Sequence, residues 1–372
     1  MGPTFLTPVH EALALRARTA AMRLEPRGPK SDAELASDVA ALGLYPYLVP
    51  QAYGGALEGI EVMSLCVLRE ELAYRSAAAD SLFAVQGLGS HPVLLAGSPA
   101  QREALLPGVA RGSVLFAFAL TEPEAGSDVA ALATRAERDQ DDYLLTGHKR
   151  FISNAGVATH YTVFARTGPG AAGLTAFVVP STASGFRVSA KMELLGEHPI
   201  GELELVKCRV PASARLGEEG AGMKLALATL DVFRSTVGAA AVGMSRRALD
   251  EAVAYSKARR QFGAPLAQLS AVQGLLADSA VDLEASRLLV HRAAAAKDSG
   301  QARITYEAAV AKLFATEAAQ RVVDRCLQVH GGNGLVKGSA MERLYRDVRA
   351  LRIYEGASEV QRMLIARWLV RD

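Results

Sequence analysis

The chain has 372 residues, of which 50% are hydrophobic and 22% charged, so it can bury a large core and form two or three domains. Its 41 basic and 39 acidic residues give a net charge of +2 without a long block of one sign, which does not indicate a nucleic-acid surface or an acidic-membrane surface. Cys66, Cys208 and Cys326 are far apart, which argues against a disulfide framework and a metal site. With no signal-peptide core and no uncharged apolar run of about 18 residues, we expect a cytoplasmic protein without membrane insertion.

Residues 8 to about 115 are rich in Ala and Leu, and Pro and Gly interrupt them at intervals. Between Ile60 and Tyr74 the apolar residues recur at helical spacing, which predicts a helix there. The run Gly97-Ser98-Pro99, followed by Gln101, predicts that one helix stops and another begins. We therefore predict an N-terminal helical domain over residues 1–115.

The pattern changes at about residue 116. Short β-prone runs at 143–146, 161–164 and 174–179 are bounded by Gly, Pro, Asn and Ser. Residues 202–205 alternate between polar and apolar, and the phase slips at Val206, as a β-bulge would cause. These features predict an antiparallel, β-barrel-like middle domain over residues 116–216.

Residues 168–173 read GPGAAG, which matches the glycine pattern of a dinucleotide-binding loop. Such a loop needs a strand before it and a helix after it, so that a pyrophosphate meets the helix N-terminus. Here a strand-like run follows, so we interpret the segment as a hairpin connection.

From residue 217 onward the pattern is helical. Residues 220–260 contain no proline and predict one helix of about 40 residues, roughly 60 Å long at 1.5 Å per residue. Breaks at 263–265, 299–300 and 331–334 divide the chain into four long segments with short connections, which are typical of a four-helix bundle. The predicted fold is mainly α with a central β-domain, and the bundle covers residues 217–372.

Four short segments carry side chains suited to binding, and each also has a simpler structural interpretation. Residues 118–128 (FALTEPEAGSD) either form an interdomain turn or present N–H groups and hydroxyls to a polar ring edge. Residues 151–154 (FISN) either end a strand or stack on a planar cofactor. Residues 259–263 (RRQFG) cap a helix or clamp a phosphate, and 328–334 (QVHGGNG) end a helix or approach a pyrophosphate.

A fifth segment, IYEGASEVQR at residues 353–362, contains a single carboxylate, Glu355, just before the last predicted helix. The spacing of Ser358 and Gln361 is that of a capping box and predicts that this helix begins at Ser358. Glu355 is either a surface acid that the helix dipole favours or a general base. The dipole would lower its pKa by less than about one unit, whereas burial shifts a carboxyl pKa by several units, so burial should dominate.

LTEPEAGSD, RRQFG, HGGNG followed by ERLYRD, and IYEGASEVQR occur in this order, and together they resemble the acyl-CoA dehydrogenase family of flavoproteins over nearly the whole chain. The resemblance implies FAD-dependent α,β-dehydrogenation of an acyl-CoA thioester to the trans-2-enoyl-CoA, as in fatty acid β-oxidation. Electrons would pass to an electron-transferring flavoprotein. Two rival functions are an acyl-CoA-binding homologue without dehydrogenase activity and a flavin oxidase of another carbon acid.

The resemblance also assigns residues. Glu355 matches the catalytic base, and Phe233 occupies the position from which some relatives supply that base. The expected FAD-binding residues are Phe118, Leu120, Thr121, Phe151, Ile152, Ser153, Ala357 and Glu359, with Arg259, Gln261, Phe262, Gln328, Gly331 and Gly332 binding the ADP half from a neighbouring subunit. The expected acyl-CoA-binding residues are Ser127, Asp231, Arg234, Tyr354, Gly356 and Arg367. The shared site implies a homodimer or homotetramer, and no metal is implied.

Three further expectations follow from the family pattern. Ser270 stands where the family often has Gln, and Ala357 where it often has Thr, so each removes a possible FAD contact. The floor of the acyl pocket should come from the helix around residues 82–89. Its small residues Ala84, Gly87 and Gly89 are expected to leave space for a medium or branched acyl chain.

Overall fold

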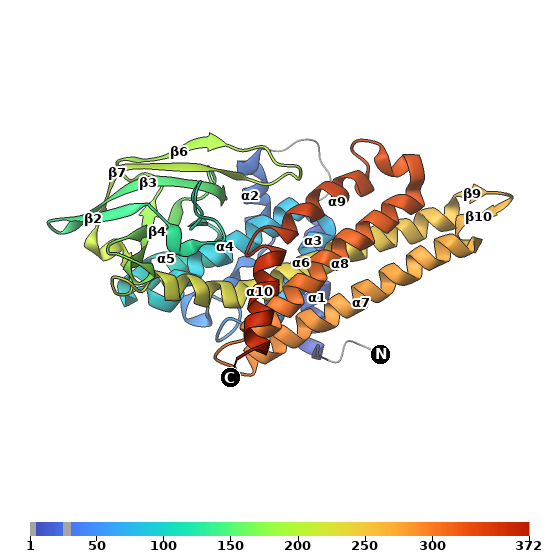
Figure 1. Ribbon diagram of the computed structural model, residues 1–372, viewed down its shortest axis with the longest axis horizontal. Helices are drawn as coiled ribbons and strands as arrows, with labels where there is room; N and C mark the ends of the chain where they lie inside the picture. The colour runs from blue at the N-terminus through green and yellow to red at the C-terminus, as the bar shows by residue number, and fades with distance from the viewer. Residues whose placement is uncertain (1–4, 25–30, 372) are drawn as a thin grey trace.

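The computed structural model describes residues 5–24 and 31–371, so the outermost residues of the first and last predicted domains lie outside the described part. Helices come first, strands follow, and long helices complete the chain, which confirms the predicted fold class. Figure 1 shows the strands of residues 116–216 gathered at one end of an elongated molecule and the long C-terminal helices extending to the other.

The N-terminal region contains α1 (Pro8–Ala21), α2 (Asp32–Ala41), α3 (Val62–Arg75), α4 (Ala77–Ala96) and α5 (Pro99–Arg111). The predicted stop and restart at residues 97–99 is confirmed. There the Ser98 hydroxyl accepts from the Gln101 N–H, and the Gln101 side chain accepts from the Ser98 N–H in return. α3 and α4 are buried on most sides because they lie between the other N-terminal helices and the C-terminal helices.

The middle region forms one sheet with the strand order β6-β7-β3-β2-β4-β5-β8, and β1 also pairs with β4. The strands are β1 (Phe116–Ala119), β2 (Arg135–Asp139), β3 (Asp142–Ser153), β4 (His160–Arg166), β5 (Leu174–Pro180), β6 (Phe186–Lys191), β7 (Ile200–Pro211) and β8 (Arg215–Leu216). Pairing is antiparallel except where β1 and the start of β2 run parallel to β4, so the purely antiparallel prediction was too simple.

Two local predictions in this sheet are confirmed. The register between β3 and β7 shifts after Leu145, which pairs with Cys208, so that Gly147 pairs with Leu205. Lys207, in the extra stretch, has φ of 46°, the left-handed conformation that occurs in one class of β-bulge. The GPGAAG segment connects antiparallel β4 and β5 and is therefore a hairpin connection, not a dinucleotide loop.

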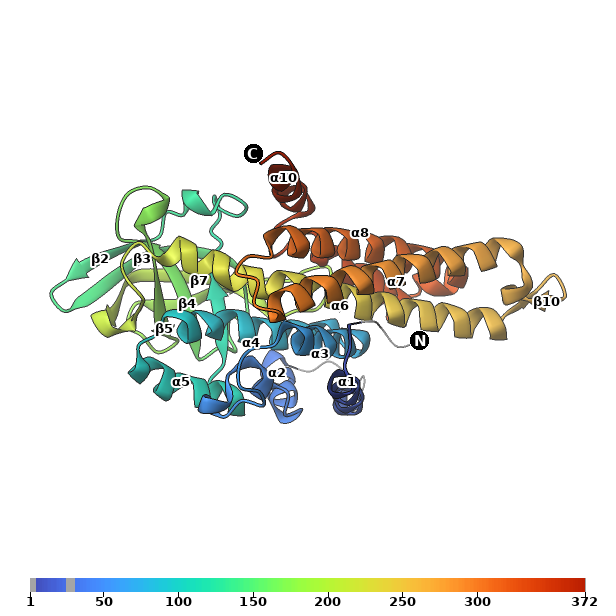
Figure 2. The same ribbon diagram turned by 90° about the horizontal axis from the view of Figure 1, so that it is seen from below.

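The C-terminal region contains α6 (Gly222–Ala258), α7 (Ser270–Asp298), α8 (Thr305–His330), α9 (Ala340–Val348) and α10 (Ser358–Leu369). The prediction of one helix over residues 220–260 is confirmed by α6. The fourth segment is not one long helix, because Gly331, Gly338, Glu355 and Gly356 have positive φ and divide it into α9, α10 and short turns. Figure 2 shows α10 projecting from the bundle beyond α8.

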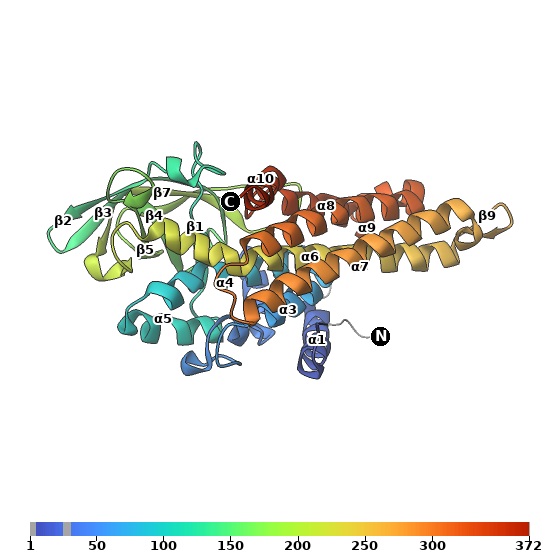
Figure 3. The same cartoon turned by 60° about the horizontal axis from the view of Figure 1, so that its bottom comes forward.

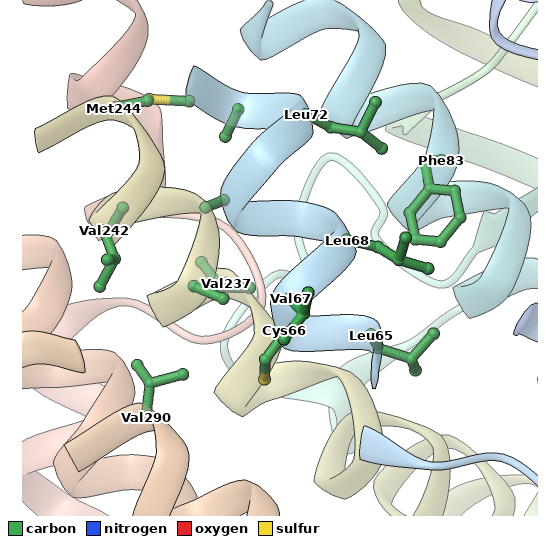
Figure 4. Packing of buried hydrophobic residues seen from close by; sticks show 14 of the residues in the cluster. Leu65, Cys66, Val67, Leu68, Leu72, Phe83, Val237, Val242, Met244 and Val290 are labelled. Atoms are coloured by element: carbon green, nitrogen blue, oxygen red, sulfur yellow. The ribbon is translucent and has the colours of Figure 1, made fainter. Parts of the chain in front are cut away.

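The largest core cluster joins the N-terminal and C-terminal helices. Figure 4 shows Cys66 of α3 towards Val237 of α6, and Leu68 on the opposite side of α3 towards Phe83 of α4. Within residues 5–24 and 31–371, only α6 contains a window that is long and apolar enough to cross a membrane, and 78% of that window is buried inside the protein. This packing accounts for the apolar composition of α6.

Candidate active site

Glu355 lies in a tight turn just before α10. It has φ of 52°, and Gly356 follows with φ of 93°. Only glycine adopts this left-handed region at little cost, so Glu355 is held in a strained conformation by its surroundings. The Gly356 carbonyl accepts hydrogen bonds from Lys312 Nζ at 2.7 Å and from Gln361 Nε2 at 2.8 Å. The turn is therefore fixed by side chains from α8 and α10.

The predicted helix start at Ser358 is confirmed, but the predicted capping box is wrong. Ser358 is already the first helical residue, and its hydroxyl donates to Glu317 Oε1 of α8 at 2.6 Å. Ala357 occupies the N-cap position and has no capping side chain. Gln361 turns its amide towards Gly356 instead of Ser358, because the bent backbone before α10 exposes the Gly356 carbonyl.

The Glu355 carboxyl group faces the interior. The residue as a whole is partly exposed, but its Oε2 atom is buried and has no hydrogen-bond partner. Burial raises the pKa of this carboxyl, while the Arg69, Lys312 and Arg234 cations oppose the rise. The direction agrees with the expectation that burial outweighs the helix terminus.

Arg69 belongs to a buried ion pair beside this carboxyl. Its guanidinium donates to both Asp80 oxygens, at 2.9 Å and 2.8 Å, and to the Thr236 hydroxyl at 2.8 Å. Arg69 and Asp80 are each only 1% exposed, so α3, α4 and α6 hold the pair rigidly. Burial also raises the pKa of the neighbouring Tyr354 phenol, which is therefore neutral.

A second polar link joins α4 to the end of β3. His198 Nε2 lies 2.6 Å from the Ser153 hydroxyl and 3.3 Å from the Ser81 hydroxyl. Burial lowers the pKa of His198 to about 4, so its imidazole is neutral at ordinary pH. Ser81 directly follows Asp80 in α4. The contacts of His198 therefore connect Ser153 to the turn of α4 that carries the Arg69–Asp80 ion pair.

The LTEPEAGSD loop is attached firmly to β3. The fully buried Lys149 donates to the Leu120 carbonyl at 3.2 Å and to Glu122 at 2.7 Å, and the Arg150 N–H donates to the Thr121 carbonyl at 2.9 Å. Burial lowers the pKa of Lys149 to about 8. The chain thus brings Leu120 and Thr121 next to the segment that contains Phe151, Ile152 and Ser153.

The residues expected on the flavin side differ in how far their side chains are exposed to solvent. Leu120 and Ile152 are buried in the core, whereas Phe118 is partly buried against Phe164, with ring centroids 4.9 Å apart. Phe151 has φ of 55° and is 49% exposed, with the Arg150 guanidinium over its ring. An aromatic face that a strained backbone holds at the surface fits a planar ring such as that of FAD.

The expected acyl-CoA residues fall into two groups. Arg234 is buried, lies 3.6 Å from Asp231 and contributes to the field at Glu355, while Thr305 donates to Asp231 at 3.3 Å. Ser127 and Arg367 are exposed, the latter on the last turn of α10, and the structure does not bring their side chains to Glu355.

The expectation of free space beside Gly87 and Gly89 is wrong. A Cβ atom on Gly87 would lie 2.6 Å from the Phe233 ring and 2.8 Å from Leu48, and one on Gly89 would lie 2.8 Å from Phe116. These glycines allow close packing of α4, so they do not enlarge a cavity. Phe233 fills the notch at Gly87.

The remaining predicted residues lie at the far end of the bundle, around β9 (Arg260–Gln261) and β10 (Ala264–Pro265) at the right of Figure 1. Tyr255 of α6 stacks on His330 of α8 at 4.5 Å, which brings the RRQFG and QVHGGNG segments together. The exposed members of this group are Arg259, Gln261, Phe262, Gln328, Gly331 and Gly332. Phe262 is 91% exposed. Ala357 and Glu359 instead lie at the start of α10.

Sequence analysis gave no functional role to Arg69, Asp80, Lys312 and Gln361 around Glu355, or to His198 beside Ser153. A charged residue inside an apolar helical stretch, such as Arg69 in LCVLREEL or Lys312 in AVAKLFA, is the signal that could have found two of them. No group of three His, Cys, Asp or Glu side chains that could hold a metal ion occurs in residues 5–24 and 31–371.

Comparison with known proteins identifies the family. Models of the acyl-CoA dehydrogenase N-terminal, middle and C-terminal domains match residues 5–113, 117–208 and 220–370. The chain therefore belongs to the acyl-CoA dehydrogenase family of FAD-dependent oxidoreductases.

Individual relatives agree with this assignment. The chain is 40% identical to a protein named probable acyl-CoA dehydrogenase from Mycobacterium leprae over 89% of this chain and 86% of that protein. Butyryl-CoA dehydrogenase from Megasphaera elsdenii is 35% identical, with a TM-score of 0.94 over 98% of this chain and 99% of the other. A glutaryl-CoA dehydrogenase from Mycobacterium smegmatis in complex with FADH2 is 29% identical, with a TM-score of 0.91 over 98% and 95% of the two chains.

Proposed function

We propose that this enzyme converts an acyl-CoA thioester to the trans-2-enoyl-CoA, with Glu355 as the base that removes the α-proton. The observation that supports this role is the buried, unpartnered Oε2 atom of Glu355. A buried carboxyl oxygen without a hydrogen bond is costly, and such groups occur mostly where a ligand completes the site.

The surroundings suit a base of moderate strength. Burial raises the pKa of Glu355 and makes its carboxylate a better proton acceptor, while Arg69, Lys312 and Arg234 keep it ionisable. The neutral Tyr354 and the neutral His198 add no competing charge. FAD, when bound, supplies the acceptor for the hydride that leaves the β-carbon. Ser153 at the end of β3 and the exposed ring of Phe151 would hold its ring system.

The acyl group that best fits this site is short. Phe233 and Leu48 close the space beside Gly87, on the helix expected to form the floor of the acyl pocket. His91 of α4 packs edge-on against the Phe233 ring, with 5.6 Å between the ring centroids, and thereby supports it. A rigid aromatic wall leaves little room for a long alkyl chain.

The proposed partners follow from the family and from the exposed far end. A second copy of the chain would cover Phe262 and the glycine turn and thereby bind the ADP half of FAD, which makes the enzyme a homodimer or homotetramer. Electrons would leave to an electron-transferring flavoprotein. Cys66, Cys208 and Cys326 are buried free thiols, which supports a reducing compartment such as the cytoplasm.

The test is anaerobic flavin bleaching by a graded series of acyl-CoA thioesters, from propionyl-CoA to palmitoyl-CoA. The wild-type flavin should bleach fastest with a short member. Glu355→Gln should bind FAD normally and reduce it at least about 10³-fold more slowly, since a positioned general base contributes roughly 10²–10⁴-fold. Near-normal reduction by this variant would remove Glu355 from the mechanism.

The same experiment separates the rival functions. Protein that stays colourless with added FAD would favour an acyl-CoA-binding homologue. Rapid oxygen consumption without an acceptor protein would favour a flavin oxidase.

A further inference from the structure

Lys312 has an unusual position for a lysine. It is 0% exposed in the middle of α8, between the apolar residues Ala311 and Leu313. Within the part of the chain that the structure describes, its Nζ donates one hydrogen bond to protein, to the Gly356 carbonyl at 2.7 Å. Burying an ammonium group with one neutral acceptor is unfavourable, so a compensating anion is expected nearby.

Among the carboxylates, Glu355 acts most strongly on Lys312. The charges that act on Lys312 are, in order, those of Glu355, Arg234, Glu317 and Glu359. They come from the turn, α6, α8 and α10, and Glu317 is already engaged by the Ser358 hydroxyl and the Arg352 guanidinium. Burial lowers the pKa of Lys312 to about 8, and Glu355 is the strongest of the groups that counteract this.

Gln361 approaches the same carbonyl from the other side. It is fully buried, and its Nε2 donates to the Gly356 backbone carbonyl oxygen at 2.8 Å and lies 3.5 Å from the backbone carbonyl oxygen of Glu355. A Cβ on Gly356 would lie 2.5 Å from this Nε2, so the amide is packed directly against the turn. One charged donor and one neutral donor therefore hold the left-handed Glu355-Gly356 backbone.

We propose that Lys312 and Gln361 are positioning residues for the base: both hold the turn through the Gly356 carbonyl, and Lys312 also stabilises the Glu355 carboxylate. This inference rests on the proposed role of Glu355. The two residues differ in one respect, because only Lys312 carries charge, and that difference makes the proposal testable.

The experiment uses FAD-loaded, full-length enzyme and compares Lys312→Met with Gln361→Met. Methionine has a similar length to both side chains but donates no hydrogen bond and carries no charge. The limiting rate of anaerobic flavin reduction is measured from pH 5.5 to 9 with the best acyl-CoA of the series. Acyl-CoA affinity is measured separately from the concentration dependence.

Both variants should lower the limiting rate by about 10- to 100-fold, because a small misplacement of a reacting group costs this much. Acyl-CoA affinity should change by less. The Lys312→Met profile should also have its acid limb at higher pH, since loss of the cation raises the pKa of the Glu355 carboxyl. Gln361→Met should lose rate without moving that limb.

Thr316→Val is the matched control for disturbance of α8. Thr316 lies one turn from Lys312, is fully buried, and donates to the Lys312 carbonyl at 2.8 Å. We expect this variant to lose stability while keeping the wild-type pH profile. If it moves the acid limb as far as Lys312→Met does, the effect is one of packing and the proposal is wrong.

Other outcomes of this experiment also test the proposal. Wild-type rate and profile in Lys312→Met would overturn the proposal. If Lys312→Met does not fold, Gln361→Met decides alone, because an unchanged rate in that variant refutes the shared hold on the turn.

Glu355→Gln separates this inference from the proposed function. If that variant is inactive while both methionine variants are normal, only the positioning roles fail, and if it remains active, the base assignment itself fails.

Discussion

Both ends of the helical bundle contain residues that the family resemblance assigned to catalysis or cofactor binding, but the structures of the two ends differ greatly. At the near end, α10 lies closer to the sheet than the β9–β10 turn does (Figure 3), and the charges of Arg69, Asp80, Arg234 and Lys312, from α3, α4, α6 and α8, act on Glu355. At the far end, Phe262 is 91% exposed on a two-stranded turn, beside the glycine-rich end of α8. One end is complete within a single chain, and the other presents its most apolar side chain to solvent.

This difference shows what each end requires. The base proposed at Glu355 needs a dry, fixed environment, and the Arg69–Asp80 pair and the Lys312–Gly356 hydrogen bond of the same chain would supply it. At the far end, Phe262 has a positive φ and an exposed ring, as the proposed contact with a second subunit would require. In the proposed oligomer, a second subunit and its FAD would complete the far end.

The largest effect that would sharpen this comparison is expected from Gly356→Ala at the near end. Gly356 has φ of 93°, and its new Cβ would contact Gln361 Nε2 at 2.5 Å, so the turn must move. We expect the limiting rate of flavin reduction to fall about 100-fold, with FAD still bound. Stopped-flow reduction with a short acyl-CoA measures this.

Gly332→Ala at the far end is the matched control. A Cβ there meets no atom within 4 Å of its own chain. The variant should fold and reduce bound flavin normally, and it should lose FAD affinity only if a partner's cofactor approaches this backbone. Equal losses of reduction rate in both variants would contradict the division of roles between the two ends.

A smaller effect is expected from Phe262→Ala. If this ring covers the cofactor of a neighbouring subunit, its loss removes an aromatic contact worth about 1–3 kcal/mol, or roughly tenfold or more in affinity for FAD. Titration of apoenzyme with FAD at a fixed oligomer concentration measures the change. Phe262→Tyr keeps the ring and should bind FAD like the wild type. Unchanged affinity in Phe262→Ala would leave the far end without a role in binding.

Sequence patterns predicted the order of the three parts, the length of α6 and the bulge in β7, because these depend on local periodicity and on turn residues. They predicted that the last helix begins at Ser358 but not that the stretch before it divides into α9 and short turns, where Glu355 has a positive φ that non-glycine residues rarely adopt. The spacing of Ser358 and Gln361 also suggested the wrong hydrogen bonds, because α8 offers Ser358 a carboxylate acceptor in Glu317.

The candidate site was only partly visible in the sequence for a similar reason. Glu355 and Ser153 belong to recognisable motifs, but Arg69, His198 and Lys312 are single residues within helical or loop segments, and tertiary packing alone gives them their roles. For the glycines of α4, the sequence suggested a feature that the structure does not contain. Small residues suggested space, whereas Phe233 of α6, 146 positions later in the chain, fills the notch at Gly87.

That packing leads to a prediction about substrate choice. Phe233→Ala should open space beside Gly87 and shift the preferred acyl length upward. Each additional methylene in an apolar pocket contributes about 1 kcal/mol, so we expect at least about a tenfold change in the ratio of rates for octanoyl-CoA and butyryl-CoA. The acyl-CoA series with flavin bleaching measures it. A uniform loss at all lengths would show that Phe233 supports the fold and does not limit the acyl chain.

The smallest effect concerns stability at acidic pH, and it tests the dryness of the near end. His91 packs against Phe233, is buried, and has no partner for Nδ1; burial lowers its pKa to about 4 from 6.5. Below pH 6.5 the unfolded chain binds a proton that the folded protein does not, so stability should fall as pH falls from 6.5 to 4. The loss from this one group is at most about 3 kcal/mol at pH 4. In urea unfolding at pH 7, 5.5 and 4.5, His91→Leu should show a shallower decline than the wild type, whatever its stability at pH 7. An equally steep decline would mean that water reaches this imidazole and that the wall behind Phe233 is not dry.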